Sequence, residues 1–465
     1  MTSRDSLDAV SPLDGRYARY TEPLSPYMSE AALMRARVEV EVEYLIALET
    51  LDEIPLTIED SDLEALRALY ADFELTDASV IKQFEIDGYA GYEATNHDVK
   101  AVEYFIRNNL PAETEPWVHF ALTSEDVNNL AYRLLVRRAF ENVLRPAIQE
   151  VRAKLQEDAA TFHDLPMLAR THGQPATPTT YGKELAVYVS RIDRSLTRIE
   201  RAGEELAGKV AGASGTYAAH HVAYPTVDWQ AFAREFISEL GFEPLPATTQ
   251  VNPGDDIAAL FDALRGLHNV LIDLNQDMWL YISNRYLKQD VSKTAAETGS
   301  STMPHKVNPI DFENSEGNLS KANNDLSFLA DTITRSRLQR DLSDSTVKRN
   351  FGTAFAHSLI GYQKAFAGLK KVVPDTSVLE AELAANPEVI GEAVQTILRR
   401  EGDPEAYERL KTLTRGSRTD IDDFHALFDD LEIDDAVREE LYQLTPDSYT
   451  GIAESIVATV LEANK

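Results

Sequence analysis

The segment from 299 to 309, Gly-Ser-Ser-Thr-Met-Pro-His-Lys-Val-Asn-Pro, combines several groups that could do chemistry. Ser300 and Ser301 offer hydroxyls, Lys306 offers a cation and Asn308 offers an amide. Successive backbone N–H groups, together with a lysine and an asparagine, can surround an anion. The segment therefore predicts an anion-binding loop that carries a candidate base. A hydroxyl-rich connection between two helices is an equal alternative on residue chemistry alone.

A histidine in a turn is the clearest candidate for moving a proton. His172 lies in the sequence Thr-His-Gly-Gln-Pro, where glycine and proline favour a turn that can project a side chain into a cleft. An imidazole titrates near neutral pH, which suits the delivery of a proton to a leaving group. For a lone histidine, a turn side chain that bonds only to the backbone is the more frequent outcome, so the surrounding motif has to decide.

Basic residues cluster between positions 335 and 349 of a chain that is otherwise strongly acidic. Five basic residues accompany two acidic ones there, a net of +3, whereas the whole chain carries −32. Guanidinium groups make paired, charge-assisted hydrogen bonds to phosphates and carboxylates, so the cluster predicts an anion site, with a solvated helix surface as the alternative. The residues concerned are Arg335, Arg337, Arg340, Lys348 and Arg349 against Asp341 and Asp344.

Composition limits the classes of protein. The chain has 465 residues, 43% of them hydrophobic, which allows a large core and two to three domains. With 77 acidic against 45 basic residues it should be repelled by nucleic acid and by anionic membranes, so we expect neither as a partner. Only 15 basic residues are lysines, which suggests a surface suited to a high-salt cytoplasm. An ordinary acidic cytosolic enzyme is equally compatible with this composition.

The absence of cysteine excludes disulfides, thiol nucleophiles and cysteine metal sites. Paired histidines at helical spacing are lacking too, and the neighbours His220 and His221 are poorly placed to chelate together. We therefore predict no metal and no cofactor. No apolar run is long enough to span a membrane, and the first residues form no apolar signal core, so we expect a soluble cytoplasmic protein.

Long helices must position these groups, because apolar residues recur every three or four positions through most of the chain. The clearest helix runs from 257 to 287. A second runs from a capping sequence at Thr123 to 155, with Pro146 as a candidate kink, and a third runs from 183 to 199. No stretch alternates in steps of two between turns, so the pattern indicates neither hairpins nor parallel-sheet units. An all-α bundle of long helices follows.

Proline and glycine clusters suggest three domains. We expect an N-terminal helical domain over 1–112 and a central long-helix domain over 113–370, which includes the loop 299–309. A C-terminal helical domain should occupy 371–465.

The segment 299–309 resembles the signature of the aspartase/fumarase superfamily of fumarate-releasing lyases. Further segments resemble the adenylosuccinate lyase family, in its longer bacterial-type branch, and the resemblance runs from about Ser11 to the C-terminus. It implies a three-domain all-α fold whose central bundle is completed by a homotetramer with shared active sites. The matching segments are 11–17, 95–100, 123–126, 170–178 and 340–346.

This resemblance also implies a reaction, the anti elimination of fumarate from adenylosuccinate to give AMP, and from SAICAR to give AICAR. By position in the motifs, Ser300 corresponds to the base, with Ser301 as its rival, and His172 to the general acid. His97 corresponds to a second active-site histidine. Lys306, with Asn308, would stabilise the doubly charged carboxylate that forms when the proton leaves.

The substrate-binding residues implied by the resemblance come from many parts of the chain. They are Arg16, Tyr17, Asn96, His97, Asp98, Thr123, Ser124, Gln250, Ser300, Lys306, Asn308, Asn314, Arg340, Ser345, Thr346, Val347, Lys348 and Arg349. Lys348 departs from the branch, which has an apolar residue there, and the stretch 88–92 is longer than usual. Two alternatives remain: a sister lyase acting on argininosuccinate, aspartate or malate, and a helical scaffold that has lost its activity.

Overall fold

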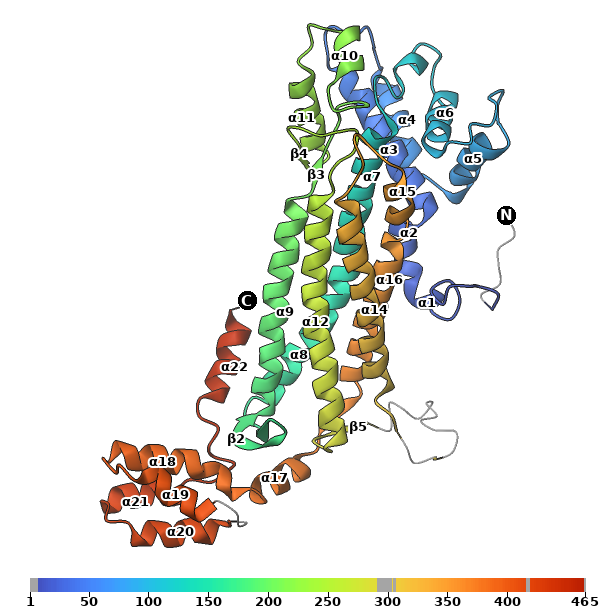
Figure 1. Cartoon of the computed structure of the whole chain (residues 1–465). Helices are drawn as coiled ribbons and strands as arrows, with labels where there is room; N and C mark the ends of the chain where they lie inside the picture. Colours follow the sequence, from blue (N-terminus) through green and yellow to red (C-terminus); the bar gives the residue numbers. More distant parts are fainter. Residues whose placement is uncertain (1–6, 291–302, 304–306, 415–418, 464–465) are drawn as a thin grey trace. The chain divides into compact units, whose positions relative to one another are not determined.

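The computed structural model describes residues 7–290, 303, 307–414 and 419–463 (Figure 1). It consists mostly of helices, which confirms the expected all-α class. The chain forms two compact units. The first unit comprises Met1–Ile148, Ser195–Asn269 and Gly317–Tyr362, and the second comprises Gln149–Arg194, Val270–Glu316 and Gln363–Lys465.

Five long helices contribute residues to both units, and they include the helices that the three- and four-residue period predicted. In α12, the predicted apolar stripe is buried, with Phe261, Leu264 and Leu267 completely covered. The bounds of these helices are α8 (Arg145–Thr161), α9 (Tyr181–Glu204), α12 (Asp255–Ser283), α14 (Ile310–Ile333) and α16 (Phe351–Leu369).

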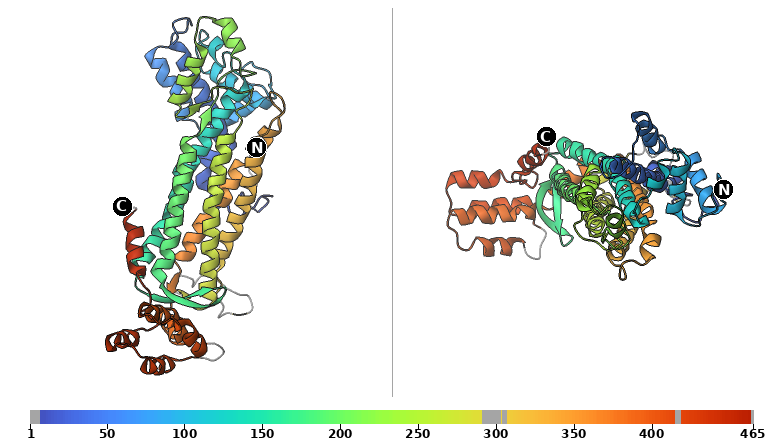
Figure 2. Two further views of the ribbon diagram at one scale, coloured as in Figure 1. Left: turned by 60° about the vertical axis from the view of Figure 1, so that its left-hand side comes forward. Right: turned by 90° about the horizontal axis from the view of Figure 1, so that it is seen from above.

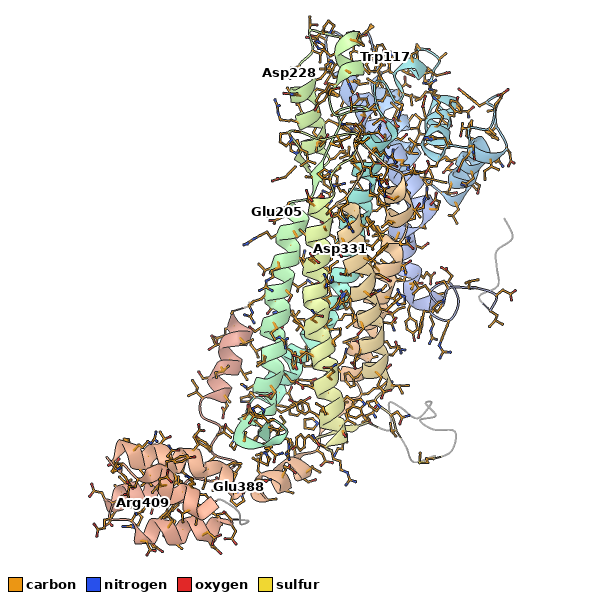
Figure 3. The ribbon with its side chains drawn as sticks, in the orientation of Figure 1. Trp117, Glu205, Asp228, Asp331, Glu388 and Arg409 are labelled. Atoms are coloured by element: carbon orange, nitrogen blue, oxygen red, sulfur yellow. The ribbon has the colours of Figure 1, made fainter. Side chains whose placement is uncertain are left out.

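The first unit contains the shorter helices of the N-terminal part of the chain and three from later parts. Side chains cap several of them: Ser29 accepts a hydrogen bond from the N–H of Ala32 at the start of α3, and Asp228, labelled in Figure 3, accepts one from Ala231 at the start of α11. The helices are α1 (Ala18–Thr21), α2 (Ser25–Met28), α3 (Glu30–Glu49), α4 (Asp60–Ala71), α5 (Leu75–Ile86), α6 (Asp98–Asn108), α7 (Ser124–Ala139), α10 (Ala218–Ala223), α11 (Trp229–Glu239) and α15 (Ser343–Lys348). The two-residue strands β3 (Ala207–Gly208) and β4 (Glu243–Pro244) pair in parallel.

The helix predicted from Thr123 to 155 is confirmed as α7 and α8, joined by one π-helical turn over Phe140–Leu144. Thr123 and Asp126 form a capping box at the start of α7, in which the N–H of Thr123 donates to Asp126 Oδ2 at 2.8 Å. The irregular turn lies directly before Pro146, which lacks an N–H and cannot continue the regular hydrogen-bond ladder. The predicted kink at Pro146 therefore takes the form of a π turn.

The second unit contains a β-hairpin that the sequence pattern did not indicate. Strands β1 (Pro166–Thr171) and β2 (Gln174–Thr180) pair antiparallel and are joined by His172 and Gly173. Both joining residues have positive φ, +55° and +77°, as a tight type I′ hairpin turn requires. The expectation of no hairpins is wrong here because two prolines and an irregular register in β2 interrupt the alternation on which it rested.

The remaining elements of the second unit follow the hairpin. Helices α18 to α21, drawn in orange and red, form one cluster in Figure 2 and share a core around Phe424 and Phe428, both completely buried. Strands β5 (Leu287–Gln289) and β6 (Val372–Pro374) pair antiparallel. The helices are α17 (Thr376–Ala384), α18 (Gly391–Arg400), α19 (Ala406–Thr414), α20 (Ile421–Asp430), α21 (Asp435–Tyr442) and α22 (Ala453–Glu462). Among the described residues, no helix has both the length and the apolar content that crossing a membrane would require.

Candidate active site

A cavity of about 570 Å³ in the first unit collects many of the residues predicted to bind substrate. Its walls come from α3, α5, the starts of α6 and α7, and the segment from 340 to 349 that contains α15. These segments are far apart in the sequence, so only the folded unit brings them together. The predicted residues that line it are Asn96, His97, Asp98, Ser124, Arg340, Ser345, Thr346, Lys348 and Arg349.

The segment before α6 is held in a defined conformation. Asn96 has a positive φ of +47°, and its N–H donates to the carbonyl of Glu85 at 2.9 Å. His97 is the N-cap of α6, where its Nδ1 accepts a hydrogen bond from the N–H of Lys100 at 3.2 Å. Because Nδ1 is used in the cap, Nε2 is the ring nitrogen of His97 that remains for a ligand.

The stretch 88–92, which the sequence left without an explanation, forms a tight turn that supports this segment. Tyr89 and Tyr92 exchange backbone hydrogen bonds at 3.1 and 2.9 Å across Ala90 and Gly91, which both have positive φ. The Tyr92 ring packs against Phe84 of α5 and Tyr104 of α6. The turn therefore joins the two helices that flank the cavity segment.

Asp98 is shared between two arginines. Its Oδ2 accepts hydrogen bonds from Arg37 Nη2 and from Arg349 Nη2, each at 2.8 Å. Burial alone would raise the pKa of Asp98, but the two guanidinium groups outweigh it and lower the pKa. Arg349 also contacts Glu30 at 2.5 Å. The carboxylate of Asp98 is thus ionised and fixes the position of Arg349.

Arg37 is a cavity residue that the sequence analysis missed. It is only 2% exposed, its Nε donates to Asn128 at 2.8 Å, and its Nη1 has no hydrogen-bond partner among the described residues. The sequence carried one signal for it, because Arg37 interrupts the apolar residues Leu33, Met34 and Val38 of α3. A charged residue within an apolar stripe usually has a specific partner.

Lys348, Arg340 and two acidic residues form a second charged cluster. Lys348 Nζ lies 2.8 Å from Glu125 and 2.7 Å from Asp344, and Arg340 Nη2 lies 3.3 Å from Glu125. Burial would lower the pKa of Lys348, yet the two carboxylates outweigh it and raise the pKa. Glu125 is 1% exposed. Lys348 therefore neutralises buried acids that the sequence analysis did not assign to the site.

The remaining predicted residues of the first unit do not line the cavity. Thr123 caps α7, directly before Ser124. Gln250 accepts a hydrogen bond from Arg340 Nη1 at 3.4 Å and donates one to the carbonyl of Ala213 at 3.0 Å. Arg16, Tyr17 and Val347 are absent from the cavity lining. The basic cluster also divides: Arg340, Lys348 and Arg349 line the cavity, whereas Arg335 and Arg337 are exposed and do not.

His172, the residue predicted to be the general acid, belongs to the second unit. His172 is exposed at the tip of the β1–β2 hairpin. Asn308 precedes α14 and Asn314 lies in its first turns. Ser300, Ser301 and Lys306 lie outside the described residues.

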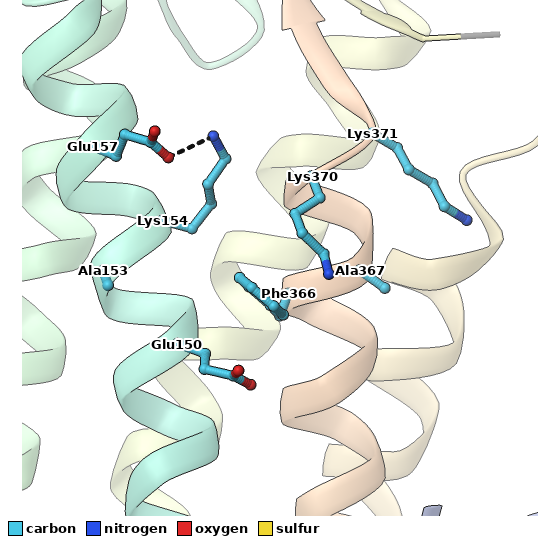
Figure 4. Close-up of a pocket in the computed structure, with 8 residues that line it drawn as sticks. All are labelled: Glu150, Ala153, Lys154, Glu157, Phe366, Ala367, Lys370 and Lys371. Carbon is cyan, nitrogen blue, oxygen red and sulfur yellow. Dashed lines mark hydrogen bonds and ion pairs between the residues drawn. The ribbon is translucent and has the colours of Figure 1, made fainter. Parts of the chain in front are cut away.

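A second cavity, of about 790 Å³, lies in the second unit between α8 and α16 (Figure 4). Ala153, Phe366 and Ala367 line it, and Lys154 pairs with Glu157 at 3.0 Å. No residue predicted for the site lines this cavity. We therefore place the candidate site at the first cavity. Within the part of the chain that the structure describes, no group of three or more metal-ligating side chains is placed to hold a metal ion.

Sequence comparison assigns the chain to a class of lyases, because the family described as "Lyase" matches residues 15–323. The family described as "Adenylosuccinate lyase C-terminal" matches residues 336–450. The chain is 44% identical over 460 residues to an adenylosuccinate lyase of Legionella pneumophila, covering 97% of this chain and 98% of the relative. The chain belongs to the adenylosuccinate lyase family, which confirms the resemblance drawn from the signature segment.

Other relatives agree. Adenylosuccinate lyases of Dictyostelium discoideum and Escherichia coli are 44% and 43% identical, over 96% and 97% of this chain and 97% and 98% of their own lengths. Among solved structures, a fumarate lyase from Mesorhizobium sp. BNC1 superposes with a TM-score of 0.74 at 20% identity, with 99% of both chains covered. At that identity the structural likeness shows the fold alone.

Proposed function

We propose that this chain cleaves adenylosuccinate to AMP and fumarate, and SAICAR to AICAR and fumarate. The observation that carries the proposal is likeness over nearly the whole chain, at 43 to 44% identity, to proteins named adenylosuccinate lyase. The cavity fits this substrate class, because Arg340 and Arg349 supply guanidinium groups that can bind a phosphate and a carboxylate.

The elimination requires a base, an acid and a stabilised intermediate. Ser300 removes the proton beside a succinyl carboxylate, and His172 protonates the departing nitrogen. The carbon acid is weak, so the doubly charged carboxylate formed on proton loss needs preorganised donors, which Lys306 and Asn308 supply. His97 contacts the phosphate or polarises the acid through its Nε2.

Charge pairing in the cavity prepares it for an anionic ligand. Arg349 already bonds to Glu30 and Asp98, and Arg340 is held by Glu125 and by Ser345 at 3.1 Å. These contacts fix the guanidinium groups before substrate arrives, which lowers the ordering entropy lost on binding. An incoming phosphate competes best for Arg349, since Arg349 and Glu30 are each more than 40% exposed.

The test is fumarate release, followed by ultraviolet absorbance, with adenylosuccinate, SAICAR, argininosuccinate, aspartate and malate as separate substrates. Turnover of the two purine substrates alone supports the proposal. Release of fumarate from argininosuccinate, aspartate or malate instead would assign the chain to a sister activity, and no release from any of them would leave a scaffold without activity.

The proposal includes an assembly and a setting. We propose a homotetramer in which each site draws on more than one subunit, and the three domains 1–112, 113–370 and 371–465. Sedimentation of the active enzyme tests the first, since a fully active monomer would contradict shared sites. We also propose a cytoplasm of high salt, on the net charge of −32. Equal activity and assembly in dilute and concentrated salt would contradict that setting.

A further inference from the structure

The turn that carries His172 is conformationally demanding. His172 and Gly173 both adopt positive φ, and for a residue with a side chain the left-handed region is less favourable than the right-handed one. Strand β2 adds an irregular register between its pairing partners Leu168 and Arg170. Left-handed residues and irregular registers persist where neighbouring contacts hold them, so the neighbours of the turn decide where the imidazole is presented.

One side chain bonds to the turn itself. Arg170, two residues before His172, donates from Nη1 to the carbonyl of Gly173 at 3.2 Å. Its Nε donates to the hydroxyl of Tyr286 at 2.9 Å, and its Nη2 forms an ion pair with Glu382. The Tyr286 hydroxyl also donates to Glu382, at 3.2 Å. One guanidinium group therefore joins the turn to two other segments of the second unit.

These partners are themselves fixed in the second unit. Tyr286 is 3% exposed, and its carbonyl accepts a hydrogen bond from the N–H of Asp375 at 2.8 Å, directly before α17. Glu382 lies on α17, and the next residue, Leu383, packs against Leu168 of β1. The hairpin is thus attached to α17 by an apolar contact below the turn and by the Arg170 network beside it.

We propose that Arg170, Tyr286 and Glu382 form a positioning clamp that holds the His172 turn in its left-handed conformation, so that the imidazole is correctly placed to protonate the leaving nitrogen. The clamp gives α17 a part in catalysis, although none of its residues need touch the substrate. The catalytic role of the clamp rests on the proposed function, whereas its effect on the conformation of the turn does not.

The fold-change expected follows from geometry. General acid catalysis contributes about 10²- to 10⁴-fold to the rate. An acid that is held out of position loses part of that rate factor. Glu382→Gln keeps the shape of the side chain and removes its charge, so we expect kcat to fall about tenfold. The KM should stay within about twofold, because the clamp does not contact substrate. Tyr286→Phe, which removes one hydroxyl, should give a smaller loss in the same direction.

The experiment compares Glu382→Gln and Tyr286→Phe with Glu380→Gln, an exposed carboxylate on the same helix that serves as the matched control. Two measurements are made on the full-length enzyme. Hydrogen exchange by mass spectrometry follows the peptide that contains residues 170–174, and steady-state kinetics in H₂O and D₂O give kcat, KM and the solvent isotope effect. Slower proton delivery raises the solvent isotope effect. A loss of folded enzyme, in contrast, lowers the apparent kcat and leaves the solvent isotope effect unchanged.

The proposal is supported if both clamp variants show faster exchange at the turn, a lower kcat and a larger isotope effect, while Glu380→Gln shows none of these changes. Exchange equal to the control would overturn the clamp. Faster exchange with an unchanged kcat or isotope effect would overturn its role in catalysis. A wild-type enzyme that releases no fumarate from the purine substrates would instead contradict the proposed function, and the exchange measurement would still decide whether the clamp exists.

Discussion

The cavity of the first unit and the hairpin of the second place charged and titratable groups in opposite ways. In the cavity, Arg37, Glu125 and Lys348 are buried and paired with opposite charges before any ligand arrives. In the hairpin, His172 is exposed and its position depends on backbone conformation. Substitutions in the cavity should therefore change stability together with binding, whereas substitutions in the turn should change catalysis alone.

The largest expected effect is on catalysis and comes from the hairpin. We expect His172→Gln to lower kcat about 10³-fold, because general acid catalysis is worth about 10²- to 10⁴-fold, and to leave the midpoint of urea unfolding unchanged. Fumarate release and urea unfolding are the measurements. His163→Gln, at another exposed histidine of the second unit, is the control and should keep full activity. A comparable activity in His172→Gln would remove this residue from the site.

The second prediction concerns the buried cluster. Lys348→Met leaves Glu125 and Asp344 without their shared cation, so the free energy of unfolding should fall by about 3 kcal/mol. Adding Asp344→Asn should restore most of this loss, because one buried negative charge then remains for Arg340. Urea unfolding measures both variants.

A matched control exists for that cluster. Lys321 pairs with Asp325 at the same four-residue separation, but Lys321 is 49% exposed. Lys321→Met should cost less than about 0.5 kcal/mol, as is usual for exposed helix pairs. Similar losses for Lys321→Met and Lys348→Met would show that burial does not distinguish the two pairs.

The sequence predicts the helices much better than it predicts the strands and the charge pairing. The apolar stripe of α12 repeats with the helical period over many turns, so Phe261 and Leu264 could be assigned to the core directly. The hairpin at His172 was missed because Pro175 and Pro178 interrupt the alternation of β2.

The candidate site shows the same limit. Motifs identified segments such as Asn96 to Asp98, since those residues are adjacent in the sequence. They could not identify the partners of Arg37 and Glu125, which lie 61 and 223 residues away along the chain. A charge on an apolar helix face indicates that a partner exists, but only the folded chain determines which one.

An intermediate case lies at the rim of the cavity. Arg349 contacts Glu30 and Asp98 but is 41% exposed. We expect Arg349→Met to raise KM about tenfold, since Arg makes strong bonds to phosphate, and to change the free energy of unfolding by less than about 1 kcal/mol. Arg337→Met, in the same basic segment but outside the cavity, should change neither quantity. An unchanged KM in Arg349→Met would exclude this arginine from substrate binding.

The smallest expected effect is the pH dependence of stability that a buried histidine causes. His268 is fully buried, its ring nitrogens contact Asn323 at 2.8 Å and Tyr362 at 2.6 Å, and burial lowers its pKa to about 4. Between that value and the ordinary value of 6.5, the unfolded chain binds more protons than the folded one, so stability falls as the pH falls. From pH 7.5 to 5.5 the loss of stability from this residue should be about 1 kcal/mol.

His268→Gln should reduce the slope of unfolding free energy against pH, leaving the part due to His220, whose pKa burial also lowers to about 4. Equal slopes for wild type and His268→Gln would contradict the effect of burial on His268.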